Sequence, residues 1–502
     1  MNKIKLSKSK YCKCVQCEKI LWLTKYKPEC AKNEDNGAIV ANGWKVGELA
    51  KGLFGDYEDI PYNEDLSVMI EKTEELMQDR PNIIAEASFS YDNNFCSVDI
   101  LKNDMDGVEI YEVKSATEIK PIYYDDAAYQ YFVLSNLGLN VKKVAIVYLN
   151  NDTYIRGKEL DINQLFNIED ITSDVEQKQD EVKSNIEMIN NFMEAQDGDN
   201  ESGTDIGIYC LDSDSPCVFW DYCTRDLPKP NVFDIFLMKK NKKFEKYYDG
   251  IISFENLEND DDFTTPRFVE QVDFELHDRN PKIETSAINE ILDSLKYPLY
   301  FIDYETFQYA VPEIEGTKAY QQIPFQYSLH IIREEGAPLQ HKEFLAKAED
   351  ENMIREFAES MIKDMPEDGS VIIYNRSFEP ARNKEIGEMY PDLKEDMERF
   401  NDNMVDFMVP FRSRKYYTKE MEGSYSIKKV LPALYPDDDE LDYSKLKLIH
   451  KGDEASEAFL SLKDKTPDEQ VKIREALLRY CELDTYAMVK IWEKFKEVTG
   501  DD

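Results

Sequence analysis

Residues 298–307 read PLYFIDYETF, an apolar strand pattern interrupted by Asp303 and Glu305. Residues two apart in a strand point to the same face, so these two carboxylates project together. Two carboxylates on one face of a core strand are costly unless a cation compensates their charge. This stretch therefore predicts a sheet in which one core strand carries part of a metal site.

Two later segments of the chain supply further groups for such a site. Residues 479–492, RYCELDTYAMVKIW, predict a helix in which Tyr480 and Asp484 lie one turn apart on the same face. Residues 371–382, VIIYNRSFEPAR, predict a strand and a turn that carry Asn375, Phe378 and Glu379. Asp406 lies between these motifs, and we expect a structural role for it rather than ligation.

The three motifs in this order resemble the DnaQ-like 3′ to 5′ exonucleases of the Tyr-containing DEDD type, which have a ribonuclease H-like fold. The resemblance implies two divalent ions, Mg²⁺ or Mn²⁺, that bracket the scissile phosphate. Asp303, Glu305 and Asp484 would be the principal ligands, Glu379 an outer ligand, and Tyr480 the group that orients the attacking water. Glu379 stands where the family has Asp, which implies altered or reduced activity; a degenerate, inactive fold is the alternative.

The first third of the chain carries a second set of acidic residues on predicted strands. Residues 96–101, CSVDIL, contain Asp99, and residues 111–117, YEVKSAT, contain Glu112 and Lys114 on one face. Two carboxylates can hold a cation that polarises a phosphodiester, while an ammonium helps to generate hydroxide or neutralises developing charge. An ordinary solvated ion pair is the other reading of this spacing.

The surrounding pattern of helix, antiparallel strands, helix and strand resembles the RecB-like branch of the PD-(D/E)XK nucleases. These have a restriction-endonuclease-like fold. The resemblance implies that Asp99, Glu112 and Lys114 are catalytic, that Gln130 on the following helix supports them, and that Glu86 is a further metal ligand. In the segment GWKVGE, Gly47 stands where the family has a metal-binding histidine. That departure bears on the number of metal ions bound and on activity.

Nine cysteines occur in a chain that we expect to be cytoplasmic, where thiols stay reduced, so metal ligation is favoured over disulfides. Cys210, Cys217 and Cys223 have the spacing C-x6-C-x5-C, and Cys17 lies far upstream. This set resembles the iron–sulfur RecB-type exonucleases and implies a 4Fe–4S cluster that fastens the two ends of the domain. Zinc and unligated core cysteines are the alternatives. Cys12 and Cys14 are rival ligands to Cys17, whereas the rest are expected to be buried thiols: Cys30, Cys96 and Cys481.

Charge and composition restrict the classes of function. The net charge of −41 argues against a general polyanion binder. Residues 1–33 nevertheless hold nine lysines against two glutamates, a net charge of +7 (9 − 2), which predicts either a phosphate-contacting patch or a solvated face. No apolar run approaches the roughly 20 residues that span a bilayer, so no membrane partner is expected. Only four histidines occur, without paired metal spacing, so multi-histidine chemistry is not expected. The lysines are residues 3, 5, 8, 10, 13, 19, 25, 27 and 32.

The sequence as a whole predicts a mixed α/β protein with three parts. These are a RecB-like nuclease domain over residues 1–225, a connector over 226–295 and a DnaQ-like domain over 296–502. This arrangement resembles an uncharacterised prokaryotic domain family that fuses the two modules. We expect a metal-dependent nuclease, exonucleolytic and acting on DNA in repair, recombination or defence. An RNA 3′ to 5′ exonuclease and a catalytically weak subunit that binds nucleic-acid ends are the alternatives.

Overall fold

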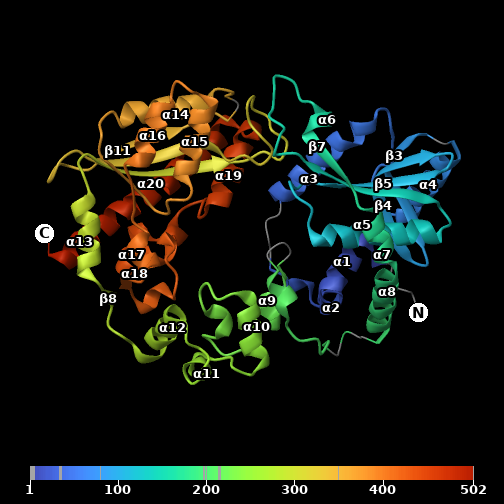
Figure 1. Cartoon of the computed structure of the whole chain (residues 1–502), viewed down its shortest axis with the longest axis horizontal. Helices are drawn as coiled ribbons and strands as arrows, with labels where there is room; N and C mark the ends of the chain where they lie inside the picture. The colour runs from blue at the N-terminus through green and yellow to red at the C-terminus, as the bar shows by residue number, and fades with distance from the viewer. Residues whose placement is uncertain are drawn as a thin grey trace. The chain divides into compact units, whose positions relative to one another are not determined.

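The computed structural model describes residues 6–32, 37–79, 81–195, 198, 201–212, 216–348 and 350–500. Contacts divide the chain into two compact units. The first contains Met1–Leu227 and Tyr309–Tyr320, and the second contains Pro228–Gln308 and Gln321–Asp502. Each unit packs helices against its own β-sheet (Figure 1). The mixed α/β class predicted from the sequence is therefore confirmed.

The sheet of the first unit is built around an antiparallel meander. Strands β3, β4 and β5 pair antiparallel, and β6 then adds parallel to β5. The strand β7 pairs antiparallel with β6, while β2 and β1 pair parallel with β3 and β4. Their bounds are β1 Leu6–Ser7, β2 Glu58–Asp59, β3 Ile83–Tyr91, β4 Asn94–Asp104, β5 Gly107–Lys114, β6 Val141–Leu149 and β7 Phe166–Asp170.

Both faces of this sheet are covered, because successive strand residues alternate between two hydrophobic clusters. In β6, Val144 and Ile146 join the cluster that contains helix α5, whereas Ala145 and Val147 join the cluster that contains helix α3. The helices are α1 Lys8–Gln16, α2 Lys19–Tyr26, α3 Gly37–Lys51, α4 Leu66–Asp79, α5 Pro121–Asn136, α6 Ile162–Leu165, α7 Thr172–Gln177, α8 Gln179–Ala195 and α9 Trp220–Cys223.

The sheet of the second unit has the spatial order β11-β10-β9-β12-β13. Strands β9, β10 and β11 are antiparallel neighbours, whereas β12 and β13 add parallel on the other side of β9. Their bounds are β9 Leu299–Phe307, β10 Ile323–Ile332, β11 Gln340–Leu345, β12 Ser370–Ile373 and β13 Met404–Asp406. A short pair, β8 Lys282–Ile283 with β14 Tyr416–Tyr417, lies apart from this sheet.

Helices cover both faces of the second sheet, which explains why every residue of β10 is buried. Gln326 and Ser328 contact helix α20, whereas Tyr327 contacts helix α14. These two helices lie on opposite faces of the sheet (Figure 1). The helices are α10 Lys240–Tyr248, α11 Phe254–Glu258, α12 Pro266–His277, α13 Thr285–Ser294, α14 Met353–Asp364, α15 Glu379–Met389, α16 Lys394–Asp402, α17 Val409–Arg412, α18 Ile427–Leu434, α19 Gly452–Ser461 and α20 Pro467–Thr499.

Helix α20 has strong local stop and start signals. Thr466 and Glu469 form a capping box, and Pro467 occupies the first turn, where its missing N–H costs nothing. Gly500 ends the helix with a positive φ of 81°. The helix predicted for residues 479–492 lies entirely within α20.

Residues 226–295, expected to be a connector, contain helices α10 to α13 and a small core that includes Val232, Leu257 and Val272. From Pro228 onward this segment belongs to the second compact unit. No helix in the described parts of the chain has both the length and the apolarity that a membrane crossing requires.

Candidate functional site

The predicted C-terminal carboxylates lie together between strand β9 and helix α20. Asp303 and Glu305 share a face of β9 with Phe301, whose ring contacts Trp492 of α20. Asp484 projects from α20 toward them, and its charge acts on both carboxylates of β9. Glu305 and Asp484 are only 7% and 8% exposed. The structure thus brings together acidic residues that are far apart in the sequence.

Simultaneous negative charges on Asp303, Glu305 and Asp484 are electrostatically unfavourable. Burial, and then Asp484 and Glu305, raise the pKa of Asp303 well above its ordinary value. Burial and then Asp484 raise the pKa of Glu305 similarly, and burial raises the pKa of Asp484 to about 6. Lys428 opposes all three shifts. The site therefore has a deficit of positive charge that a divalent cation would relieve.

Lys428 and Tyr443 belong to this site, although the sequence analysis did not identify them. Lys428 Nζ donates a hydrogen bond to the Tyr480 hydroxyl at 3.2 Å, and the Tyr443 hydroxyl donates to Asp484 Oδ1 at 2.6 Å. Burial and then Asp484 raise the pKa of Tyr480, so it remains a phenol. No sequence signal separates Lys428 from its neighbour Lys429, which pairs with Glu422 instead.

Glu379 begins helix α15 and is 2% exposed. Burial raises the pKa of Glu379 to about 7, and its Oε2 has no hydrogen-bond partner in the described part of the chain. Its charge acts on Asp303, so the two carboxylates are near one another. Asp406 accepts hydrogen bonds from the backbone N–H groups of Asn375 at 3.1 Å and Met408 at 2.9 Å, as its expected structural role requires.

Cys481 also contributes to this site, beyond its expected role as a buried thiol. Its Sγ lies 3.7 Å from the Asp303 carbonyl oxygen. Ligand atoms of Asp303, Glu305 and Cys481 all lie within 4.8 Å of one another. Burial raises the pKa of the Cys481 thiol well above its ordinary value, so it stays protonated beside the carboxylates.

The predicted N-terminal residues also meet, between strands β4 and β5 and helix α5. Gln130 Nε2 donates to Glu112 Oε2 at 2.6 Å, and Lys114 Nζ donates to Glu112 Oε1 at 2.7 Å. Asp99 Oδ2 accepts a hydrogen bond from the Val113 backbone N–H at 2.7 Å. Glu112 and Gln130 are 1% and 0% exposed. Gln130 of helix α5 therefore fixes the orientation of the Glu112 carboxylate.

Two further charged residues, Lys8 and Asp126, complete the N-terminal set. Lys8 Nζ donates to Glu112 Oε1 at 2.7 Å, and Lys114 pairs with Asp126 as well as with Glu112. Burial acts to raise the pKa of Glu112, but Lys114 and Lys8 together lower it below its ordinary value. Asp126 lies four residues before Gln130, so helical spacing could have identified it.

Lys8 comes from the basic segment that was expected to be either a phosphate-contacting patch or a solvated face. In this structure it neutralises a buried carboxylate instead. Lys3 and Lys5 of the same segment lie outside the described residues. Burial, and then Glu112, raise the pKa of Asp99 to about 7.

Glu86 and Gly47 lie at the edge of this set. Glu86 lies opposite Asp99 at the one position where the β3–β4 pairing is interrupted, with an unchanged register on either side, and it has a positive φ of 57°. Ser97 Oγ donates to the Glu86 carbonyl oxygen at 3.0 Å, and burial raises the pKa of the Glu86 carboxyl. At Gly47, on helix α3, an added Cβ would meet no atom within 4 Å. Packing therefore does not require glycine at the position where the family has histidine.

Cysteines from the two ends of the first unit gather in one place. Cys17, at the end of α1, packs with Cys217 and Cys223 against a cluster that contains Trp22 and Phe219. Cys210 joins them, since the Cys217 N–H donates to its carbonyl oxygen at 3.1 Å. A hydrogen bond from Cys210 lowers the pKa of Cys217 to about 7.

The remaining cysteines divide between core and cluster. The rival ligands Cys12 and Cys14 belong to the main core of the first unit, as does the fully buried Cys96. Cys30 was expected to be a buried thiol, but it is partly exposed and packs in the cluster with Cys217 and Cys223. Its position at the end of a short 3-10 turn, Pro28–Cys30, brings it there.

The four predicted cluster cysteines do not form one of the closely spaced groups of ligand atoms found among the described residues. Two triads have ligand atoms that all lie within 4.8 Å of one another. One contains Asp303, Glu305 and Cys481, and the other contains His330, His341 and Glu482.

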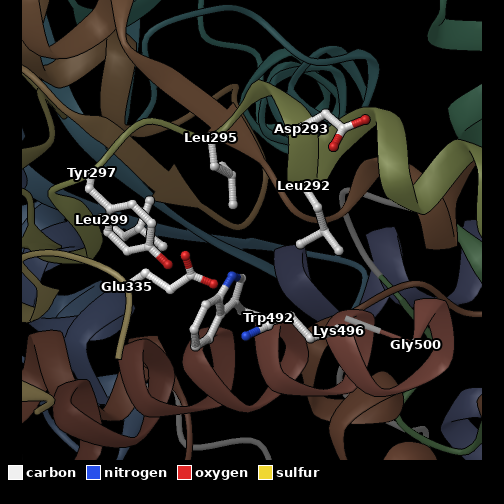
Figure 2. Close-up of a pocket in the computed structure, with 9 residues that line it drawn as sticks. All are labelled: Leu292, Asp293, Leu295, Tyr297, Leu299, Glu335, Trp492, Lys496 and Gly500. Carbon is white, nitrogen blue, oxygen red and sulfur yellow. The ribbon is translucent and has the colours of Figure 1, made fainter. Parts of the chain in front are cut away.

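A cavity of about 500 Å³ lies in the second unit near the end of α20, apart from these carboxylates. Figure 2 shows Trp492 and Glu335 projecting into it, with Leu292 opposite. None of the acidic residues described above lines this cavity. Its lining residues are Leu292, Asp293, Leu295, Tyr297, Leu299, Glu335, Trp492, Lys496 and Gly500.

Comparison with known proteins gives two matches. A family described as a domain of unknown function (DUF2779) matches residues 300–426, which include Asp303, Glu305 and Glu379 but not Tyr480 or Asp484. An uncharacterised protein of Ureaplasma parvum serovar 3 is 26% identical over 245 residues, which cover 45% of this chain and 35% of that protein. The chain thus matches about a third of that relative's length. No solved structure matches this chain.

Proposed function

We propose that this chain is a divalent-metal-dependent nuclease whose principal catalytic centre consists of Asp303, Glu305 and Asp484. The observation that carries the proposal is the buried acidic cluster with raised pKa values and Lys428 as its opposing cation. Carboxylate oxygens are the ligands that Mg²⁺ and Mn²⁺ prefer. Burying several carboxylates side by side lowers the stability of the fold, and carboxylates with strongly shifted pKa values are typical of functional sites.

The residues of the chain have distinct roles in the proposed reaction. When bound, the metal ions would polarise the phosphodiester and favour ionisation of the attacking water. The phenol of Tyr480 would orient that water, while Lys428 Nζ, 3.2 Å from the hydroxyl, fixes the ring and offsets negative charge. Tyr443 holds Asp484 by its 2.6 Å hydrogen bond. Glu379 would be an outer ligand, because its Oε2 is buried without a partner in the described residues.

The topology of each unit supports the proposed fold families. In the second unit, three antiparallel strands are extended by two parallel strands beside the first, as expected for a ribonuclease H-like domain. In the first unit, α3, the meander β3 to β5, helix α5 and the parallel strand β6 follow the order expected for a PD-(D/E)XK domain. Fold alone does not define a reaction, so the proposal depends on the carboxylates.

For the first unit we propose a weaker or auxiliary nuclease centre. Asp99, Glu112 and Lys114 would be its catalytic residues, Gln130 its supporting residue and Glu86 a further ligand. Lys8 and Lys114 already compensate the charge of Glu112. Electrostatic attraction would therefore stabilise a bound metal ion less at this site than at the C-terminal site.

We propose that Cys17, Cys210, Cys217 and Cys223 hold a 4Fe–4S cluster with a structural role. Four sulfurs at about 2.3 Å from one Zn²⁺ would be about 3.8 Å apart, closer than these cysteines come as a set. Anaerobic purification with an iron assay and an absorption spectrum tests this assignment. We expect stoichiometric iron; stoichiometric zinc without iron would exclude the cluster.

We propose DNA as the substrate class, with an RNA 3′ to 5′ exonuclease as the second candidate, since these acidic residues do not read a 2′-hydroxyl. The test is cleavage of end-labelled single-stranded DNA, duplex DNA and RNA with Mg²⁺ or Mn²⁺. Asp303→Ala and Lys114→Ala assign the activity to one unit. Glu343→Gln, an exposed carboxylate on β11, is the matched control. Binding of these substrates without cleavage of any of them would leave only an end-binding subunit.

A further inference from the structure

A second group of candidate ligands lies on the second sheet, beyond the proposed catalytic carboxylates. His330 of β10 and His341 of β11 are directly opposite one another, with ring centroids 4.6 Å apart. Glu482 of α20 completes a triad whose ligand atoms all lie within 4.8 Å. The histidines have no motif spacing, so only the antiparallel pairing of β10 with β11 brings them together.

A chain of hydroxyl groups fixes the orientation of both imidazole rings. His330 Nδ1 lies 2.8 Å from Thr485 Oγ1, and His341 Nε2 lies 2.9 Å from Ser328 Oγ. The two hydroxyls are 2.7 Å apart, and Thr485 Oγ1 donates to the Glu482 carbonyl oxygen at 3.0 Å.

One assignment of protons satisfies every member of this chain. Thr485 donates to the carbonyl oxygen, and Ser328 donates to Thr485. Each histidine then donates its N–H, from His330 Nδ1 to Thr485 and from His341 Nε2 to Ser328. Within the described residues, these hydrogen bonds do not use the lone pairs of the other ring nitrogens, His330 Nε2 and His341 Nδ1. Metal-binding histidines are held in this way, with the second nitrogen donating to a fixed acceptor.

The third member offers a carboxylate oxygen from the helix. Arg479 Nη1 donates to Glu482 Oε2 at 2.9 Å, and within the described chain this leaves Oε1 for a ligand. His330 is 4% exposed, so its imidazole lies inside the fold beside that of His341.

We propose that His330, His341 and Glu482 bind one Zn²⁺ ion that fastens helix α20 to the β10–β11 edge of the sheet. Two imidazoles and one carboxylate suit Zn²⁺ better than Mg²⁺ and leave a fourth position for water. Ligands at about 2.0–2.1 Å from a tetrahedral ion are about 3.4 Å apart, so small rotations of the partly exposed His341 and Glu482 complete the site. The ion would thereby fix the helix that carries Tyr480 and Asp484.

The test is zinc stoichiometry and calorimetric titration of the full chain with Zn²⁺ alone, after treatment with a chelator. Wild type is compared with His341→Ala and with Glu482→Gln, a conservative change on a helix surface. The matched control is His277→Ala, an exposed histidine that pairs with the carboxylate of Glu258. All variants keep the cysteines, so metal bound there cancels in the differences.

We expect wild type and His277→Ala to bind one Zn²⁺ more than His341→Ala and Glu482→Gln. Ser328→Ala, which removes the hydroxyl that accepts from His341 and donates to Thr485, should weaken this Zn²⁺ site by about 10- to 100-fold. Equal zinc content and affinity in wild type, His341→Ala and Glu482→Gln would refute the site and leave a hydrogen-bonded histidine pair. Zinc binding is measured without nucleic acid, so its failure and failure of the nuclease proposal are separate outcomes.

Discussion

The two carboxylate sites contain similar residues but differ in how their charge is compensated. In the first unit, two ammonium groups lie 2.7 Å from Glu112 Oε1 and hold its pKa below the ordinary value. In the second unit, Lys428 is the cation that acts on the carboxylates, and the pKa values of Asp303 and Glu305 stay well raised. The two motifs therefore place similar carboxylates, but the surrounding charges differ, and so would the stabilisation that a metal ion supplies.

The largest expected effect is on nuclease activity. Asp303→Asn should lower kcat by about a thousandfold, because it removes a charge that holds the metal against the transition state. Glu112→Gln should lower it by less than about tenfold, since the first site contributes little to the proposed reaction. Release of nucleotides from a labelled strand with Mn²⁺ measures both. An equal loss in the two variants would break the contrast between the sites.

The next effect is the dependence of stability on pH in the absence of metal. The folded pKa of Asp484 is about 6, above its ordinary 3.8, so the folded state holds this proton longer and stability falls as pH rises between these values. At pH 7 the raised pKa of Asp484 lowers the free energy of unfolding by about 3 kcal/mol. Glu112 has a lowered pKa, so its contribution is present above its unfolded pKa near 4.5 and is lost as pH falls.

Urea unfolding across pH 3 to 8 with a chelator separates these opposite slopes. Asp484→Asn should become more stable relative to wild type as pH rises, whereas Glu112→Gln should become less stable. Excess Mn²⁺ should remove the Asp484 slope, because the ion replaces the proton as the compensating charge. Slopes of the same sign in the two variants would contradict the charge difference.

A smaller effect would make the charge compensation of the two sites more alike. Lys8→Ala removes one of the two ammonium groups at Glu112, so Mn²⁺ binding in the first unit should strengthen by about tenfold, or about 1.4 kcal/mol. Calorimetry in an Asp303→Asn background isolates this site. Lys10→Ala, an exposed lysine on the same helix, should leave the affinity unchanged. Unchanged affinity in Lys8→Ala would mean that Lys8 does not compete with metal.

The smallest effect concerns one hydrogen bond. Tyr443→Phe removes the donor to Asp484 Oδ1, which should cost about 1 kcal/mol and raise the pKa of Asp484 further. The acidic limb of the rate–pH profile should then move to higher pH. Tyr435→Phe loses a hydrogen bond to the Lys490 carbonyl oxygen, remote from the carboxylates, and should leave that limb in place. Identical profiles for all three proteins would remove Tyr443 from the site.

Local patterns predicted much of the secondary structure and the acidic pairs. The apolar run at residues 298–307 forms β9, Leu299–Phe307, as its strand pattern predicted. Period-two spacing correctly put Asp303 and Glu305 on one face, and helical spacing did the same for Tyr480 and Asp484. These relations depend on residues close in sequence, so the sequence contains them.

Contacts between residues far apart in the sequence could not be predicted from local patterns. Lys8 reaches Glu112 across 104 residues, and Lys428 reaches Tyr480 across 52. The register of β10 against β11 and the packing of α20 decide that His330, His341 and Glu482 meet. The sequence by itself therefore determined which strands and helices present carboxylates and cysteines. Only the tertiary structure decided which charges surround them, because Coulomb interactions depend on distance in space and on burial, not on separation along the chain.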